Sequence, residues 1–193
     1  GQAGGRAATD TGRGRLAMTD MTLVRTSREE IEVYRFGPIV SIVVPLLALV
    51  IQAFVPVRFH AFAVLDLPLL VTIFFAVTRR SQIAGLLTGA IIGLVQDALT
   101  HQAIGLYGIA LTVVGYGASS LGVKIDVENP GTRLLVTSGF YLVHQAVYFL
   151  VARNILGVTT LEWLWGRTLL AALFNGVASI ILFAVLDRFK RGT

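Results

Sequence analysis

Two acidic residues, Asp66 and Asp97, lie within long apolar stretches of the sequence, and His144 and Asn175 lie within two others. Two carboxylates that meet at a water-accessible point could act as an acid–base pair or relay protons. Together with an imidazole and an amide they could also bind an ion or a polar substrate. In the alternative, structural interpretation these groups hydrogen bond neighbouring helices or pair with an arginine. The residues alone leave both interpretations open and favour the structural one.

The two carboxylates are expected to differ in their surroundings. Asp97 lies near one end of its apolar stretch, where we expect water to reach it. Asp66 lies about seven residues, or roughly 10 Å, from the end of its own stretch. We therefore expect Asp66 to be the more constrained of the two groups.

Other signatures of chemistry are missing from the sequence. It has no cysteine, so it has no thiolate nucleophile or thiolate metal ligand, and its three histidines are scattered. It has no phosphate-binding glycine loop with a lysine, no His-Glu-x-x-His motif and no serine in a nucleophile elbow. The basic residues lie between apolar runs and do not form one basic domain. We therefore predict no cofactor, no metal and no nucleic-acid partner, and we expect any activity to be intramembrane or exerted through partners.

The elements that must position these residues are apolar runs. Hydrophobic residues make up 55% of the chain and charged residues 14%, against about 25% charged residues in soluble domains. Because a membrane-spanning helix needs about 20 mostly apolar residues, we predict an all-α polytopic membrane bundle of six transmembrane helices. The six runs are residues 38–57, 59–77, 83–99, 104–123, 134–151 and 168–186. The alternative fuses or re-enters the first two runs at the junction around Pro56 and gives five spans.

The distribution of basic residues predicts the orientation. If the N-terminus is cytoplasmic, 13 of the 16 lysines and arginines fall on the inside, and only Arg58, Arg153 and Arg167 fall outside. Cytoplasmic loops are enriched in Lys and Arg, so we predict a bacterial inner-membrane protein with both termini in the cytoplasm. The predicted parts are a disordered cytoplasmic segment (1–36), a six-helix domain (37–188) and a short basic cytoplasmic tail (189–193).

Three further features concern the ends and loops. Residues 1–16 are rich in Gly, Ala and Arg, and Met18 or Met21 is a plausible initiator. Residues 25–36 could form a short amphipathic helix before the first span. Trp163 and Trp165 suit either an interfacial segment at the level of the lipid headgroups or a simple flank of the sixth helix.

Small residues form a regular row in the third run. Gly85, Gly89 and Gly93 recur at every fourth position, and Asp97 continues the row. Such a row allows close approach of another helix backbone. We predict a tight helix–helix interface and favour a partner helix within this chain over one from another chain. The sixth run carries Asn175 in a similar row between Ala171 and Ser179.

Several short motifs in order resemble the family of the bacterial rod shape-determining protein MreD. They are Asp66-Leu67-Pro68, Arg79-Arg80, the stretch 89–97 from Gly89 through Gly93 to Asp97, the stretch 105–111 that begins at Gly105, and Gly115-Tyr116. The resemblance covers roughly residues 66–124 and weakens after Pro130. It implies architectural or partner-facing roles, not catalysis. The positions that match the family pattern are Asp66, Gly89, Gly93, Asp97, Gly105 and Gly115. The full set of structural or partner-facing candidates also includes Pro68, Gly85, Tyr116 and Asn175.

The resemblance also implies a cellular role and a fold. Members of the family sit in the inner membrane beside MreC and help link MreB filaments to the polymerase RodA and its partner transpeptidase in cell-wall elongation. Their fold is similar to the substrate-binding S-components of energy-coupling-factor transporters. Two alternatives stay open. One is a vitamin-binding transporter subunit, which predicts a closed cavity beneath the outer loops. The other is an intramembrane enzyme using Asp66 and Asp97.

Overall fold

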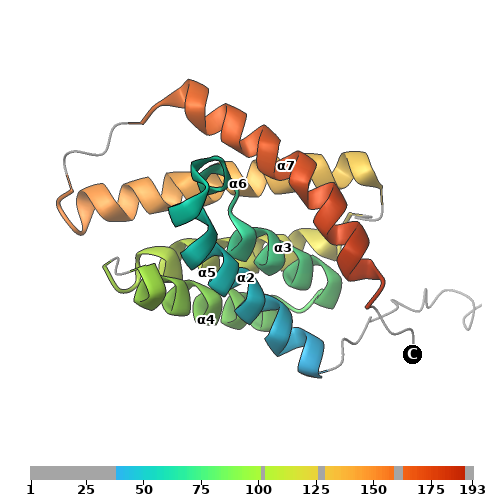
Figure 1. Ribbon diagram of the computed structural model, residues 1–193. Helices are drawn as coiled ribbons and strands as arrows, with labels where there is room; N and C mark the ends of the chain where they lie inside the picture. The colour runs from blue at the N-terminus through green and yellow to red at the C-terminus, as the bar shows by residue number, and fades with distance from the viewer. Residues whose placement is uncertain (1–37, 101–102, 126–128, 159–162, 190–193) are drawn as a thin grey trace, which may run out of the picture. The chain divides into compact units, whose positions relative to one another are not determined.

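The computed structural model describes residues 38–100, 103–125, 129–158 and 163–189 (Figure 1). The chain divides into two units, Gly1–Glu32 and Val33–Thr193, and the described residues belong to the second. The predicted segment 1–36, with its amphipathic helix at 25–36, lies outside the described residues, as does the tail beyond Phe189.

Each predicted apolar run contains one α-helix, and within the described residues there is no strand. The helices are α2 (Pro38–Arg58), α3 (Leu67–Arg79), α4 (Gln82–Thr100), α5 (Leu106–Gly122), α6 (Pro130–Asn154) and α7 (Trp165–Asp187). Of these, α2, α4, α6 and α7 are long and apolar enough to cross a membrane, whereas α3 and α5 have 13 and 17 residues. The prediction of an all-α polytopic membrane bundle is confirmed.

The second run differs from the single span expected over residues 59–77. A 3-10 helix, η1 (His60–Val64), comes first, and α3 begins only at Leu67. Pro68 lies in the first turn of α3, where its missing N–H costs nothing and where it blocks continuation of a helix from the N-terminal side. Asp66 is therefore the N-cap of a short helix and does not lie within a continuous one. Since α2 and α3 are separate helices, the first two runs do not fuse into one helix, and the re-entrant form of the five-span alternative stays a prediction.

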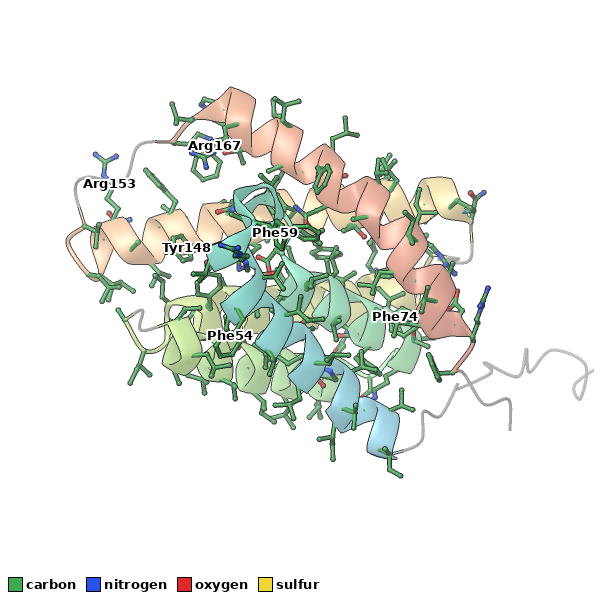
Figure 2. The ribbon with its side chains drawn as sticks, viewed as in Figure 1. Phe54, Phe59, Phe74, Tyr148, Arg153 and Arg167 are labelled. Atoms are coloured by element: carbon green, nitrogen blue, oxygen red, sulfur yellow. The ribbon has the colours of Figure 1, made fainter. Side chains whose placement is uncertain are left out.

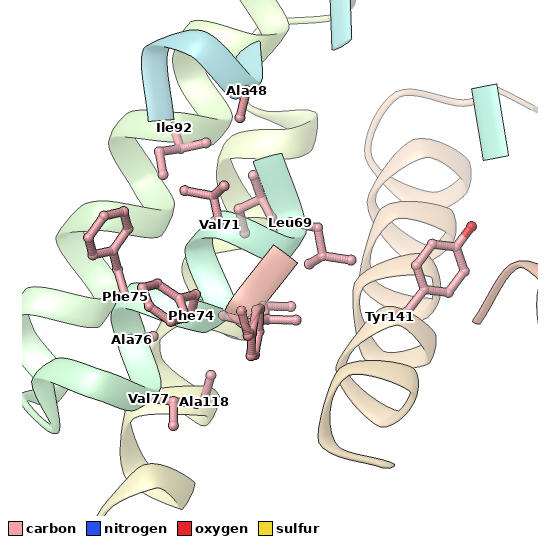
Figure 3. Packing of buried hydrophobic residues seen from close by; sticks show 14 of the residues in the cluster. Ala48, Leu69, Val71, Phe74, Phe75, Ala76, Val77, Ile92, Ala118 and Tyr141 are labelled. Carbon is pink, nitrogen blue, oxygen red and sulfur yellow. The ribbon is translucent and has the colours of Figure 1, made fainter. Parts of the chain in front are cut away.

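The short helix α3 forms the centre of the hydrophobic core. Ten consecutive residues, Pro68–Val77, are buried, which requires neighbours on every side of the helix. Phe74 packs on Phe183 of α7 with ring centroids 5.1 Å apart. Figure 3 shows Val71, Phe74 and Phe75 among side chains from the surrounding helices, including Ile92 and Ala118. The shortest helix is thus shielded by the longer ones.

The outer helices α2 and α7 expose apolar side chains. Figure 2 labels one of these, Phe54 of α2, whose exposed fraction is 70%. Leu46 and Leu47 of α2 and Leu170 and Ile181 of α7 are also more than half exposed. An apolar surface of this extent fits a lipid environment or the helices of partner proteins.

Candidate functional site

Asp97, at the C-terminal end of α4, caps the N-terminus of α5. Its Oδ2 accepts hydrogen bonds from the backbone N–H groups of Gly105 (2.8 Å) and Gly108 (3.1 Å), and its Oδ1 accepts one from Tyr107 N (3.0 Å). The first N–H groups of a helix have no partner within it, and a negative charge there is favourable. The expectation that Asp97 is solvated was wrong: the residue is fully buried, and backbone donors replace water.

Gly105 makes this cap possible through its backbone conformation. Its φ of +101° lies in the left-handed region, which glycine adopts at little cost. A Cβ at this position would meet nothing within 4 Å, so the conformation, and not the available space, requires glycine. The turn brings the N–H of Gly105 back to Asp97.

The glycine row of α4 packs directly on the backbone of α5. A Cβ on Gly85, Gly89 or Gly93 would come closer than 3.0 Å to the backbone carbonyl oxygens of Gly115, Leu111 and Tyr107, respectively. The structure therefore places the partner helix within this chain. Residue numbers rise along α4 while those of the contacted residues fall along α5, so the two helices are antiparallel.

α5 also packs closely on two other helices. A Cβ on Gly122 would meet the backbone of Val77 in α3, and one on Gly117 would meet the ring of Phe140 in α6. Gly115 faces Gly85, whereas Tyr116, the next residue, has 49% of its surface exposed. Among the candidate residues drawn from the sequence, Tyr116 is the one that lies plainly on the outside.

Asn175 of α7 ties the break between η1 and α3 to the rest of the bundle. Its Oδ1 accepts a hydrogen bond from Asp66 N (2.8 Å), and its Nδ2 donates to Val64 O (2.8 Å) and Ala171 O (2.9 Å). Backbone groups freed by a broken helix must find partners inside a membrane protein. Asn175, which is fully buried, supplies partners on both sides of the break.

Gln52 of α2 holds the same break and was missed from the sequence. Its Oε1 accepts a hydrogen bond from Leu67 N at 3.1 Å. The available signal was the single amide of a mostly apolar helix of 21 residues, because a polar side chain within such a helix usually faces protein.

Asp66 lies beside His144, and its carboxylate also caps the N-terminus of α3. Its Oδ1 accepts from Leu69 N (3.1 Å), and its Oδ2 lies 3.8 Å from His144 Nδ1. His144 is 1% exposed, and within the described residues neither of its ring nitrogens has a hydrogen-bond partner. The ring of Tyr107 lies 5.6 Å from that of His144, centroid to centroid. Asp66 and Asp97 thus cap different helices, α3 and α5.

A cavity of about 850 Å³ lies between α6, α7 and η1. Its lining includes Val64, Tyr141, Gln145, Arg167, Leu170 and Phe174. Gln145 Nε2 donates a hydrogen bond to Tyr141 Oη at 2.9 Å. The predicted polar group of Asp66, His144 and Asn175 is not part of the lining, so the cavity lies outside that group.

A second cavity, the α2–α7 groove, has a volume of about 400 Å³ and an apolar lining. Val43 and Leu47 of α2, Val71 of α3, and Leu182 and Leu186 of α7 contribute to it. In the described part of the chain, no group of three or more His, Asp or Glu residues could hold a metal ion.

Of the two tryptophans near the start of α7, Trp163 packs on Phe149 of α6 and Trp165 packs on Trp163. Trp165 is the first residue of α7, which agrees with a flank of the sixth helix, while Leu161 and Glu162 lie outside the described residues. The ring of Trp163 contacts those of Phe149 and Trp165, each at a centroid distance of 5.3 Å.

No curated protein and no solved structure matches the chain, so the likeness to transporter S-components stays a prediction. The family model of the rod shape-determining protein MreD matches residues 34–191, which include all six helices described above. The match extends well beyond residues 66–124, where the sequence motifs lie. This integral membrane chain therefore belongs to the MreD family of rod shape-determining proteins.

Proposed function

We propose that the protein is a non-enzymatic scaffold of the cell-wall elongation complex in the bacterial inner membrane. Membership of the family supports the proposal. The structural observation that carries it is that buried and exposed residues have different roles. Asp97, Asn175 and the glycine row hold helices together inside the chain. The outer helices offer apolar surface to other molecules. Such a molecule contributes to cell shape through contacts between helices.

The proposed topology has six crossings and two cytoplasmic ends. Its support is the placement of 13 of the 16 basic residues on the inside in that arrangement. In this topology Arg79 and Arg80, at the C-terminal end of α3, face the cytoplasm, and Arg153 and Arg167 face the outside.

The partner surface that we propose is the α2–α7 groove. Its α2 side extends from Ile39 to Ile51, which is about 18 Å along the helix, and apolar side chains line it. These features fit an apolar transmembrane helix, and we assign it to an MreC-like protein. RodA and the elongation transpeptidase are further proposed partners in the membrane, and MreB filaments are contacted only indirectly.

Cross-linking tests the surface, because the chain has no cysteine of its own. Leu47→Cys places a thiol in the groove, and Ile91→Cys places one on the exposed face of α4. The two native side chains are similarly exposed, Leu47 at 56% and Ile91 at 62%. We expect an MreC-like protein carrying a cysteine in its transmembrane helix to cross-link to position 47 and not to position 91. Equal cross-linking at both positions would refute the assignment of the groove.

Co-purification from native membranes tests the function itself. We expect an MreC-like protein to be recovered with the full chain, and depletion of the chain to turn rods into spheres. Normal cell shape after depletion, with no such partner recovered, would exclude the scaffold function whatever the outcome at the groove.

A further inference from the structure

We propose that the cavity between α6 and α7 binds an amphiphile with an anionic phosphate headgroup. In this arrangement Arg167 contacts the phosphate, and Leu170 and Phe174 contact the hydrocarbon chain. The site is separate from the α2–α7 groove, and it does not depend on the proposed scaffold function.

The cavity results from the way α6 and α7 are joined. Arg133, near the start of α6, pairs with Asp187 at the end of α7, with 2.5 Å between Nη2 and Oδ2. One turn further along α6, Ser138 Oγ donates to Ala172 O at 3.0 Å. In Figure 1 the two helices cross, and the C-terminal end of α6 separates from the N-terminal end of α7. The resulting volume of about 850 Å³ lies within the range of about 300–1,000 Å³ that is typical of ligand sites.

The charge of the cavity lining favours an anion. Arg167 lines the cavity, and none of the described lining residues is acidic. Among the described residues no carboxylate lies within ion-pair distance of the Arg167 guanidinium. A guanidinium next to apolar surface is stabilised by an anionic partner, and its planar donors match two oxygens of a phosphate.

The polar part of the wall supplies a second donor. Tyr141 Oη accepts its hydrogen bond from Gln145 Nε2, so the hydroxyl hydrogen of Tyr141 remains available for an oxygen of the ligand. Both residues line the cavity together with Arg167. Two donors from two helices can thus converge on one headgroup.

The apolar part of the wall continues from the arginine along one face of α7. Leu170 and Phe174 follow Arg167 at spacings of three and seven residues, which place the three side chains on one helix face. Their exposed fractions are 71% and 52% for Leu170 and Phe174. The stripe extends about 10 Å from the charge and gives a hydrocarbon chain a surface that a free phosphate would not use.

Native mass spectrometry of the full chain with added lipids tests the site. We expect phosphatidylglycerol to bind at least tenfold more tightly than phosphatidylcholine, whose headgroup has no net charge. Arg167→Gln should weaken phosphatidylglycerol binding about tenfold. The matched control is Arg153→Gln, because Arg153 is exposed near the same ends of α6 and α7 and its guanidinium lies over Phe149 (5.8 Å) instead of lining the cavity.

A second pair of measurements distinguishes a lipid from a soluble phosphate. Leu170→Gln alters the apolar stripe and leaves Arg167 in place, so it should weaken phosphatidylglycerol binding. Glycerol phosphate should compete poorly with the lipid in the unaltered chain. Equal losses for Arg153→Gln and Arg167→Gln would overturn the site. Effective competition by glycerol phosphate, or no effect of Leu170→Gln on lipid binding, would refute the proposal that the ligand is an amphiphile.

Discussion

The pair α4–α5 and the pair α6–α7 are joined in opposite ways. In the first, glycines bring the two backbones into contact, and Asp97 of one helix caps the other. In the second, polar contacts join the N-terminal half of α6 to α7, and a cavity of about 850 Å³ lies beside the junction. The first pair has no room for a Cβ at Gly85, Gly89 or Gly93, whereas the second has unused volume. We infer that α4–α5 fixes the fold and that α6–α7 is free to accommodate other molecules.

Replacing the cap of α5 should give the largest loss of stability. Asp97→Ala removes the acceptor of three N–H groups, and we expect the free energy of unfolding to fall by about 4 kcal/mol because buried donors would lose their partners. Asp97→Asn retains one acceptor oxygen and should lose less. Titration with sodium dodecyl sulfate in mixed micelles measures both. If Asp97→Ala and the unaltered chain were equally stable, the Asp97 cap would not contribute to the stability of the α4–α5 pair.

Adding one methyl group to the α4–α5 interface should cost nearly as much. In Gly89→Ala the new Cβ overlaps the carbonyl group of Leu111, and separating the helices should cost about 3 kcal/mol. The matched control is Gly139→Ala in α6, where the Cβ meets nothing within 4 Å and helix propensity improves. The same titration compares them. If the two variants were equally stable, the α4–α5 contact would not be as close as described.

Removing Asn175 should have a smaller effect that is local to the break before α3. Asn175→Ala leaves Asp66 N and Val64 O without these partners, and we expect a loss of about 2 kcal/mol. Asn154→Ala, at the exposed end of α6, is the control and should change little. Hydrogen exchange at residues 64–70 should be faster in Asn175→Ala than in Asn154→Ala. Equal exchange rates there in the two variants would contradict a local role of Asn175.

Adding atoms beside the cavity should have the smallest effect. Ala171 lines the cavity, so Ala171→Leu should change the stability by about 1 kcal/mol or less, because the larger side chain can enter existing space. The same substitution at Ala110, which is fully buried in α5, should cost several times more. Comparable melting temperatures for the two leucine variants would show that the two helix pairs do not differ in available volume.

The positions of the helices could be predicted from the sequence because the bilayer imposes a length on apolar runs. The spacing of Gly85, Gly89 and Gly93 likewise predicted a close interface, and Asp66-Leu67-Pro68 carried the signal for a helix start that a count of apolar residues overlooked. The burial of Asp97 could not be read from its place near a helix end, because it depends on how the turn at Gly105 folds back.

The cavity could not be predicted at all from the residues that form it. Its volume depends on the relative inclination of α6 and α7, and that inclination is set by contacts far from Arg167, such as the pair of Arg133 and Asp187. Of the polar residues predicted to group around Asp66, Asp66 itself and Asn175 complete backbone hydrogen bonds, whereas His144 lies beside Asp66 without a hydrogen bond among the described residues. In a bundle of this kind, polar residues at depth indicate where helices break before they indicate where ligands bind.

The length of α3 has a consequence for biogenesis. Its 13 residues extend about 20 Å, which is less than the roughly 30 Å of the hydrocarbon layer. A nascent chain that ends after α3 would therefore hold this segment poorly in the bilayer. Stable integration must await the synthesis of α4 and α5, whose close pairing supplies the walls around it, so that assembly of the bundle is coupled to translation of its middle third.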